Sequence, residues 1–290
     1  MTAQDPVPHT PQQAAAPARY PWHLRLSWLF VLIGGIVAYV ATFVIMLLTG
    51  NPTMLPTVLL VGAGTIPATV LLFAQSTKAG PLVPTRILLV TAVAGGLVGI
   101  CAAGLEERIA GAFLGRASIL LVGVIEETAK VIVPLLILAL AHRATRGGGI
   151  VIGIAAGTGF AALETMGYGF NALLAKGGGL AALDATLVLR GILVPAGHVA
   201  WTGMLCAALW YLVETSHKGR GALAVAGAYA LAILLHTAWD ATGSNGLRIL
   251  IGVVSVGALV ALILAAHRAV VRRAALGAPT APIAVGAPGA

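Results

Sequence analysis

Long apolar runs recur along almost the whole chain, and short segments rich in glycine, proline and basic residues separate them. A helix that crosses the hydrocarbon core of a bilayer needs about 20 mostly apolar residues. We predict spans at residues 26–48, 54–75, 87–105, 117–141, 150–174, 191–213, 221–242 and 247–266. The pattern predicts an all-α fold: a polytopic membrane helix bundle of about eight transmembrane helices.

The composition agrees with a membrane environment. Hydrophobic residues make up 59% of the chain and charged residues only 9%, which leaves too few polar side chains to cover a soluble globule. The two ends, residues 1–25 and 274–290, are rich in alanine and proline and lack apolar periodicity. We therefore predict disordered tails on either side of a helix bundle at residues 26–273.

Basic residues are distributed unevenly between the two sides of the predicted bundle. Lys130 aside, eleven lysines and arginines lie on the side shared by both termini and five on the other. This bias predicts that both termini are cytoplasmic. We expect a multi-pass integral protein of a bacterial-type plasma membrane. Anionic lipid head groups suffice as partners for the net charge of +8, so we predict a lipid bilayer and no nucleic acid as partner.

Ionisable residues interrupt four consecutive predicted spans, although a charged side chain in hydrocarbon costs about 2.5–3.5 kcal/mol on insertion scales. They are Glu126, Glu127 and Lys130 in span 117–141, Glu164 in 150–174, His198 in 191–213, and His236 and Asp240 in 221–242. At a rise of about 1.5 Å per residue, each span carries a glutamate or histidine roughly 9–15 Å below its outer end. Since distant sequence positions have no local reason to agree in depth, the agreement predicts a single site.

Spacing within the spans supports the same site. Glu126 and Lys130 are four residues apart, as are His236 and Asp240, so each pair shares a helical face. We expect Asp240 to orient the His236 imidazole. Pro195 should kink the sixth span near His198.

Two further charged residues need an interpretation. We favour Arg190 as an interfacial anchor, with its long side chain reaching toward the membrane surface; the alternative is that it is a charge partner for the site glutamates. Asp184 is expected to be solvated at a loop edge.

The order of these residues resembles the motifs of the PrsW family of intramembrane proteases, distant relatives of the CAAX-prenyl endopeptidases. The matching features are Glu126-Glu127-x-x-Lys130, Phe160-x-x-x-Glu164 within GFAALE, His198, and His236-x-x-x-Asp240, on successive predicted helices. The resemblance implies a protease core at residues 117–243 that hydrolyses a peptide bond of a membrane-anchored protein. It also implies an anti-sigma factor as substrate, cut in a first, site-1 type cleavage.

The candidate catalytic residues are Glu126, Glu127, Glu164, His198, His236 and Asp240. Ionised, their carboxylates exceed the charges of Lys130 and Arg190 by about two, which a low-dielectric site tolerates poorly. We therefore favour a divalent metal, such as Zn²⁺, with Glu164, His198 and His236 as ligands and Glu126 or Glu127 as base. In a metal-free alternative Glu126 activates water directly and the two histidines hold the oxyanion.

Three other interpretations remain open at this stage. The buried Glu–Lys pair can be purely structural, and a membrane histidine can simply bond a neighbouring helix. A proton-coupled transporter also uses buried glutamates and histidines, although we find no internal repeat of the kind common in transporters. A non-catalytic scaffold subunit would keep the fold without activity.

The charge bias predicts the outcome of a topology experiment. Reporter fusions after Arg146 and Lys218 should behave as cytoplasmic, and fusions after Arg116 and Gly178 as external. The reverse pattern would move the site toward the cytoplasmic face and favour a cytoplasmic substrate.

Overall fold

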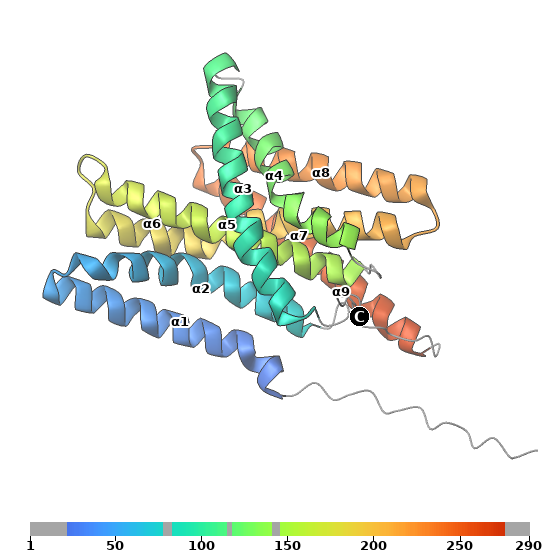
Figure 1. Ribbon diagram of the computed structural model, residues 1–290, viewed down its shortest axis with the longest axis horizontal. Helices are drawn as coiled ribbons and strands as arrows, with labels where there is room; N and C mark the ends of the chain where they lie inside the picture. Colours follow the sequence, from blue (N-terminus) through green and yellow to red (C-terminus); the bar gives the residue numbers. More distant parts are fainter. Residues whose placement is uncertain (1–21, 78–82, 115–117, 141–145, 276–290) are drawn as a thin grey trace, which may run out of the picture.

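The structure is a computed structural model that describes residues 22–77, 83–114, 118–140 and 146–275. Within these ranges every long element is a helix, which confirms the all-α class (Figure 1). The helices are α1 (Trp22–Thr49), α2 (Leu55–Ser76), α3 (Thr85–Leu114), α4 (Ser118–Leu140), α5 (Arg146–Leu174), α6 (Leu180–Leu193), α7 (His198–Glu214), α8 (Lys218–Ala241) and α9 (Asn245–Ala275). Short 3₁₀ helices occupy Pro52–Met54 and Val194–Ala196.

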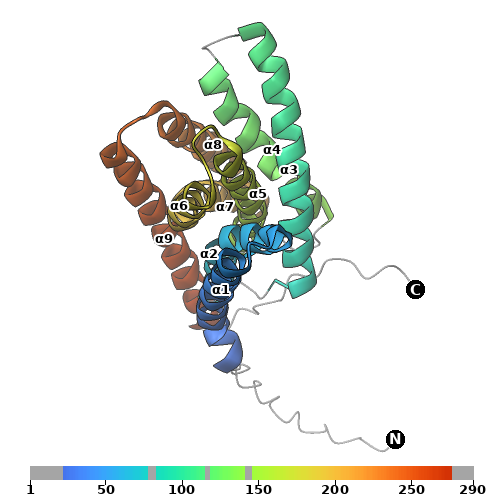
Figure 2. The same ribbon diagram turned by 90° about the vertical axis from the view of Figure 1, so that its left-hand side faces the viewer.

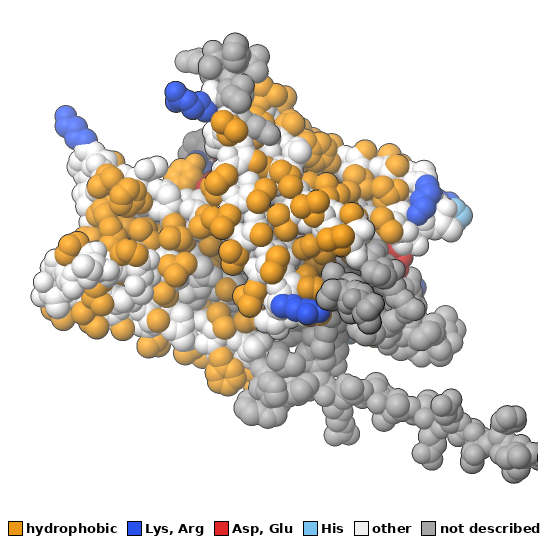
Figure 3. Space-filling view, viewed as in Figure 1, with side chains coloured by type: hydrophobic (Ala, Val, Ile, Leu, Met, Phe, Trp, Pro, Cys, Tyr) orange, Lys and Arg blue, Asp and Glu red, His pale blue; other side chains and the backbone are white. Residues whose placement is uncertain are grey.

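The described helices have the length and surface of a membrane bundle. Seven segments among them are long and apolar enough to cross a bilayer. The 23-residue α4 is not one of the seven, because it carries Glu126, Glu127 and Lys130 within its apolar sequence. Figure 3 shows hydrophobic side chains spread over one face of the molecule, with lysines and arginines near its margins. An exterior of this kind is suited to lipid rather than water.

Both ends of the bundle extend into the predicted tails. Helix α1 begins at Trp22, within the predicted tail 1–25, and α9 ends at Ala275, within the predicted tail 274–290. The rest of both tails lies outside the described residues.

The sixth predicted span, 191–213, is wrong as a single continuous helix. Helix α6 starts earlier, at Leu180, and ends at Leu193; a 3₁₀ turn containing Pro195 follows, and α7 begins at His198. The sequence did not predict α6, because Asp184 and Arg190 interrupt its apolar residues. The break lies at the proline, which has no N–H for the helical ladder, and it places His198 in the first turn of a new helix.

Helices α5, α6 and α7 occupy the centre of the bundle. In Figures 1 and 2 they lie between α8 on one side and α1 with α2 on the other, and α3 crosses them steeply. On the α1 side, the Tyr39 hydroxyl donates a hydrogen bond of 2.7 Å to Asp184 Oδ1 on α6. Asp184 therefore lies within α6 and is half-buried, so the expectation that it stands at a loop edge is wrong.

Glycines allow the central helices to approach each other closely. A Cβ added at Gly157 on α5 would lie 2.6 Å from the carbonyl oxygen of His198 on α7. A Cβ at Gly159, on another side of α5, would overlap the carbonyl of Ala92 on α3. Such contacts replace side chains by direct backbone packing, as is common between membrane helices. The contact at Gly157 brings His198 of α7 next to Glu164 of α5.

The contact at Gly159 predicts a selective loss of stability. Gly159→Ala should lower the melting temperature of the detergent-solubilised protein, because the new methyl group meets backbone that cannot move aside; overpacking costs about 1–3 kcal/mol. Gly167→Ala on the same helix is the matched control, since no atom lies within 4 Å of its added Cβ. Equal melting temperatures for the two variants would contradict the proposed contact.

Candidate active site

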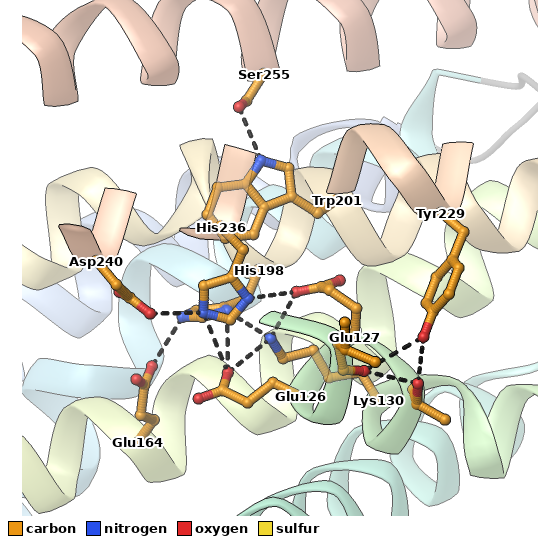
Figure 4. Close-up of polar contacts among 12 residues, drawn as sticks. Glu126, Glu127, Lys130, Glu164, His198, Trp201, Tyr229, His236, Asp240 and Ser255 are labelled. Atoms are coloured by element: carbon orange, nitrogen blue, oxygen red, sulfur yellow. Dashed lines mark hydrogen bonds and ion pairs between the residues drawn. The ribbon is translucent and has the colours of Figure 1, made fainter. Parts of the chain in front are cut away.

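Lys130 lies at the centre of the polar cluster shown in Figure 4. Its Nζ is 2.9 Å from Glu126 Oε2, 2.8 Å from Glu127 Oε1 and 2.8 Å from His198 Nδ1. The ammonium also lies 4.2 Å from the centroid of the Phe160 ring. The side chain is fully buried, and its three N–H donors have three acceptors. Lys130 is thus a paired internal cation that links α4 to α7.

His236 on α8 is held by carboxylates at both ring nitrogens. Its Nδ1 lies 2.9 Å from Glu127 Oε1, and its Nε2 lies 3.3 Å from Asp240 Oδ2 and 3.5 Å from Glu126 Oε2. Asp240 does contact the ring, as expected from the four-residue spacing. The shortest contact, however, is that of the completely buried Glu127, which fixes Nδ1 and leaves Nε2 facing Glu126 and Asp240.

His198 on α7 has a carboxylate partner of its own. Its Nε2 lies 2.9 Å from Glu164 Oε2, and Arg190 on α6 donates to the same oxygen at 2.6 Å. The guanidinium also lies 4.0 Å from the centroid of the Tyr168 ring. The favoured interpretation of Arg190 as an interfacial anchor is therefore wrong, and the alternative, a charge partner for a site glutamate, is confirmed by its contact with Glu164.

The two histidines are arranged alike. Each has one nitrogen on a glutamate, Glu164 for His198 and Glu127 for His236, and each glutamate is paired with a cation. The remaining nitrogens both face Glu126, whose Oε2 is 3.9 Å from His198 Nδ1. A carboxylate on the outer nitrogen of a histidine is the usual support for a histidine that binds a metal.

Glu126, His198 and His236 could hold a metal ion. Each offers one ligand atom, these atoms lie within 4.8 Å of one another, and all three residues are buried. Two ligands about 2.0–2.1 Å from a tetrahedral zinc lie roughly 3.4 Å apart, close to the 3.5 Å between Glu126 Oε2 and His236 Nε2. The donor set fits a divalent cation, although Glu126 stands in this group where the sequence pattern suggested Glu164.

Lys130 shares its partners with this candidate metal group. Its Nζ contacts Glu126 Oε2 and His198 Nδ1, two groups that an ion would also use. Glu127 Oε1 is the acceptor that Lys130 can keep when an ion is bound. The second oxygen, Glu127 Oε2, is buried without a hydrogen-bond partner among the described residues.

Exposure varies across the cluster. The side chain of Asp240 is 38% exposed and that of Arg190 22% exposed, and Tyr168 is an exposed residue. Phe160 and Trp201 are buried. Among the described residues, the cluster is therefore most exposed where α5, α6 and α8 contribute Tyr168, Arg190 and Asp240.

Two residues that support the site histidines, Trp201 and Ser255, were not predicted from the sequence. Trp201 packs against both histidine rings, and its Nε1 donates a hydrogen bond of 2.9 Å to Ser255 Oγ on α9. The only signal for Trp201 was its position three residues after His198, on the same face of the helix. Nothing in the sequence pointed to Ser255.

The comparisons with known proteins agree with this geometry. The family model for PrsW family intramembrane metalloproteases matches residues 83–268, which include all six candidate catalytic residues. No curated protein and no solved structure matches the chain. The matched region covers more than half of the chain, and the chain therefore belongs to the PrsW family of intramembrane metalloproteases and is a membrane protease of that family.

Proposed function

We propose that the protein hydrolyses a peptide bond of a membrane-anchored protein with a water activated between Glu126, His198 and His236. The observation that carries the proposal is the buried group formed by these three side chains, with ligand atoms within 4.8 Å of one another. Asp240 and Arg190, which are partly exposed, would lie where a substrate segment approaches this group. A structural ion pair alone would not need two oriented histidines.

Glu126, His198 and His236 would hold a divalent cation, whose chemistry is to polarise a carbonyl oxygen and to acidify a bound water. Glu164 and Glu127 each accept a hydrogen bond from one imidazole and so fix the nitrogen that faces Glu126. Lys130 and Arg190 balance the charge of these two glutamates. In this proposal Glu127 and Glu164 are positioning residues rather than groups that touch the substrate.

Proton transfer to and from the substrate needs a carboxylate that is not fully enclosed by protein. Asp240 is the most exposed of the site carboxylates and lies 3.3 Å from His236 Nε2. We assign Asp240 to take up the proton of the attacking water and to return it to the leaving amine. If no metal takes part, Glu126 is the general base, since its side chain is 10% exposed and Glu127 is fully enclosed.

The proposed substrate is the outer end of a single-pass membrane helix. Glu126 lies eight residues after the start of α4 at Ser118, or about 12 Å along the helix axis. With the topology predicted from the basic residues, that is the extracytoplasmic side. A membrane-bound anti-sigma factor, the substrate that the family resemblance implies, would present its first cleavage site there.

Replacing Glu126 separates catalysis from structure. Glu126→Gln should lower the cleavage rate by at least about 100-fold while the melting temperature stays near that of the wild type, because Lys130 keeps the carboxylate of Glu127 as its partner. Glu127→Gln should lower both, since it weakens two buried charge contacts. Membrane proteomics of cells with wild-type or Glu126→Gln protein identifies the substrate, and cleavage is then measured in proteoliposomes.

The opposite pattern would refute a catalytic role for Glu126. An unstable Glu126→Gln variant that regains stability and activity together with Lys130→Met would mean that the pair is structural. Full cleavage by a stable Glu126→Gln variant would also contradict the proposal.

Metal removal tests the ion directly. Chelation should abolish cleavage, and Zn²⁺ or Co²⁺ should restore it. His236→Ala should lose the bound metal measured by mass spectrometry of the purified protein, because it removes one of three ligands. The exposed His217 provides the control, and His217→Ala should retain the metal. Undiminished cleavage by metal-free protein would instead support the alternative in which Glu126 acts on water without an ion.

A further inference from the structure

Trp201 forms a closed group of three rings with the two site histidines. The centroid of its ring lies 5.0 Å from that of His236 at an interplanar angle of 30°, and 5.5 Å from that of His198 at 79°. The two imidazole centroids are themselves 5.2 Å apart. Trp201 is thus stacked on one histidine and edge-on to the other, and these are the favoured geometries for aromatic pairs.

Ser255 on α9 fixes the orientation of the Trp201 ring. The Ser255 hydroxyl donates its one hydrogen to the carbonyl oxygen of Ile251 at 2.8 Å. Its lone pairs are therefore free to accept the hydrogen bond of 2.9 Å from Trp201 Nε1. Both residues are buried, so water cannot replace Ser255 as the acceptor.

A fixed indole limits the movements that the imidazoles can make. His236 can bring Nδ1 to Glu127 and Nε2 to Glu126 only at one ring orientation. Rotation of the ring out of this plane would drive it into the face of Trp201 or away from both carboxylates. The indole also covers one face of the His236 imidazole, since the two rings are stacked with their centroids 5.0 Å apart.

We propose that Trp201, held by Ser255, is a positioning residue that sets the ring orientations of His198 and His236. This inference rests on the function proposed above for the two histidines. It also gives α9 a role in the site, since the ring orientations depend on an acceptor from a helix that carries none of the candidate catalytic residues.

The test compares three purified variants in detergent. Ser255→Ala removes the acceptor and keeps the indole, and Trp201→Phe removes the donor and part of the ring. Trp210→Phe is the matched control, because Trp210 is equally buried on the same helix and has no ring contact with either histidine among those found. Melting temperatures measured for all three variants give the general cost of altering a buried side chain.

The first measurement is the NMR spectrum of the protein labelled at histidine. Ring currents of the stacked indole should shift the His236 ring protons upfield in the wild type. Ser255→Ala and Trp201→Phe should move the signals of both site histidines, and Trp210→Phe should leave them unchanged. Wild-type histidine signals in Ser255→Ala would overturn the inference, whatever its melting temperature, because this variant keeps the indole and changes only its hydrogen bond.

The second measurement is Co²⁺ binding, followed by its visible absorption. Loss of a group that orients a ligand typically lowers metal affinity about 10- to 100-fold, so Ser255→Ala should bind Co²⁺ at least about tenfold more weakly than Trp210→Phe. Equal affinities would overturn the inference. A wild-type protein that neither binds Co²⁺ nor cleaves would refute the proposed function, and the NMR comparison would still decide whether Trp201 orients the histidines.

Discussion

The buried ammonium of Lys130 is the interaction on which the rest of the site depends. Lysine is normally too costly to enclose in an apolar bundle, and this one is held by Glu126, Glu127 and His198 at 2.8–2.9 Å. Leaving such a buried charge without any compensating partner typically costs about 3–5 kcal/mol. Because Lys130 compensates two adjacent carboxylates, α4 can place both of them next to the histidines of α7 and α8.

Close backbone packing supplies the geometry that this charge cluster needs. Gly157 lets α5 lie against the first turn of α7, so that Glu164 reaches His198 at 2.9 Å. The break after Leu193 allows α6 to present Arg190 to Glu164 while α7 begins directly with His198. In a continuous helix, the relative orientation of Arg190 and His198 would instead be fixed by the helical spacing between them. The irregular backbone is tolerated at this depth because it is enclosed by protein.

The site combines buried aromatic rings with partly exposed charged side chains. Phe160 and Trp201 are buried against His198, whereas Asp240 and Arg190 are partly exposed. The low local dielectric beside the buried rings strengthens the charge interactions next to them.

The sequence by itself determined the helical class, the spans apart from α6 and the six residues that converge, because apolar length and the rarity of charge in hydrocarbon are local properties of the chain. Helical spacing also placed Asp240 beside His236. Tertiary structure decided which site side chains contact each other. Glu127 rather than Asp240 makes the closest contact with His236, Glu164 lies between Arg190 and His198, and Trp201 depends on Ser255. These contacts join different helices, whose rotations are fixed only when the bundle packs, and no spacing within one helix encodes them.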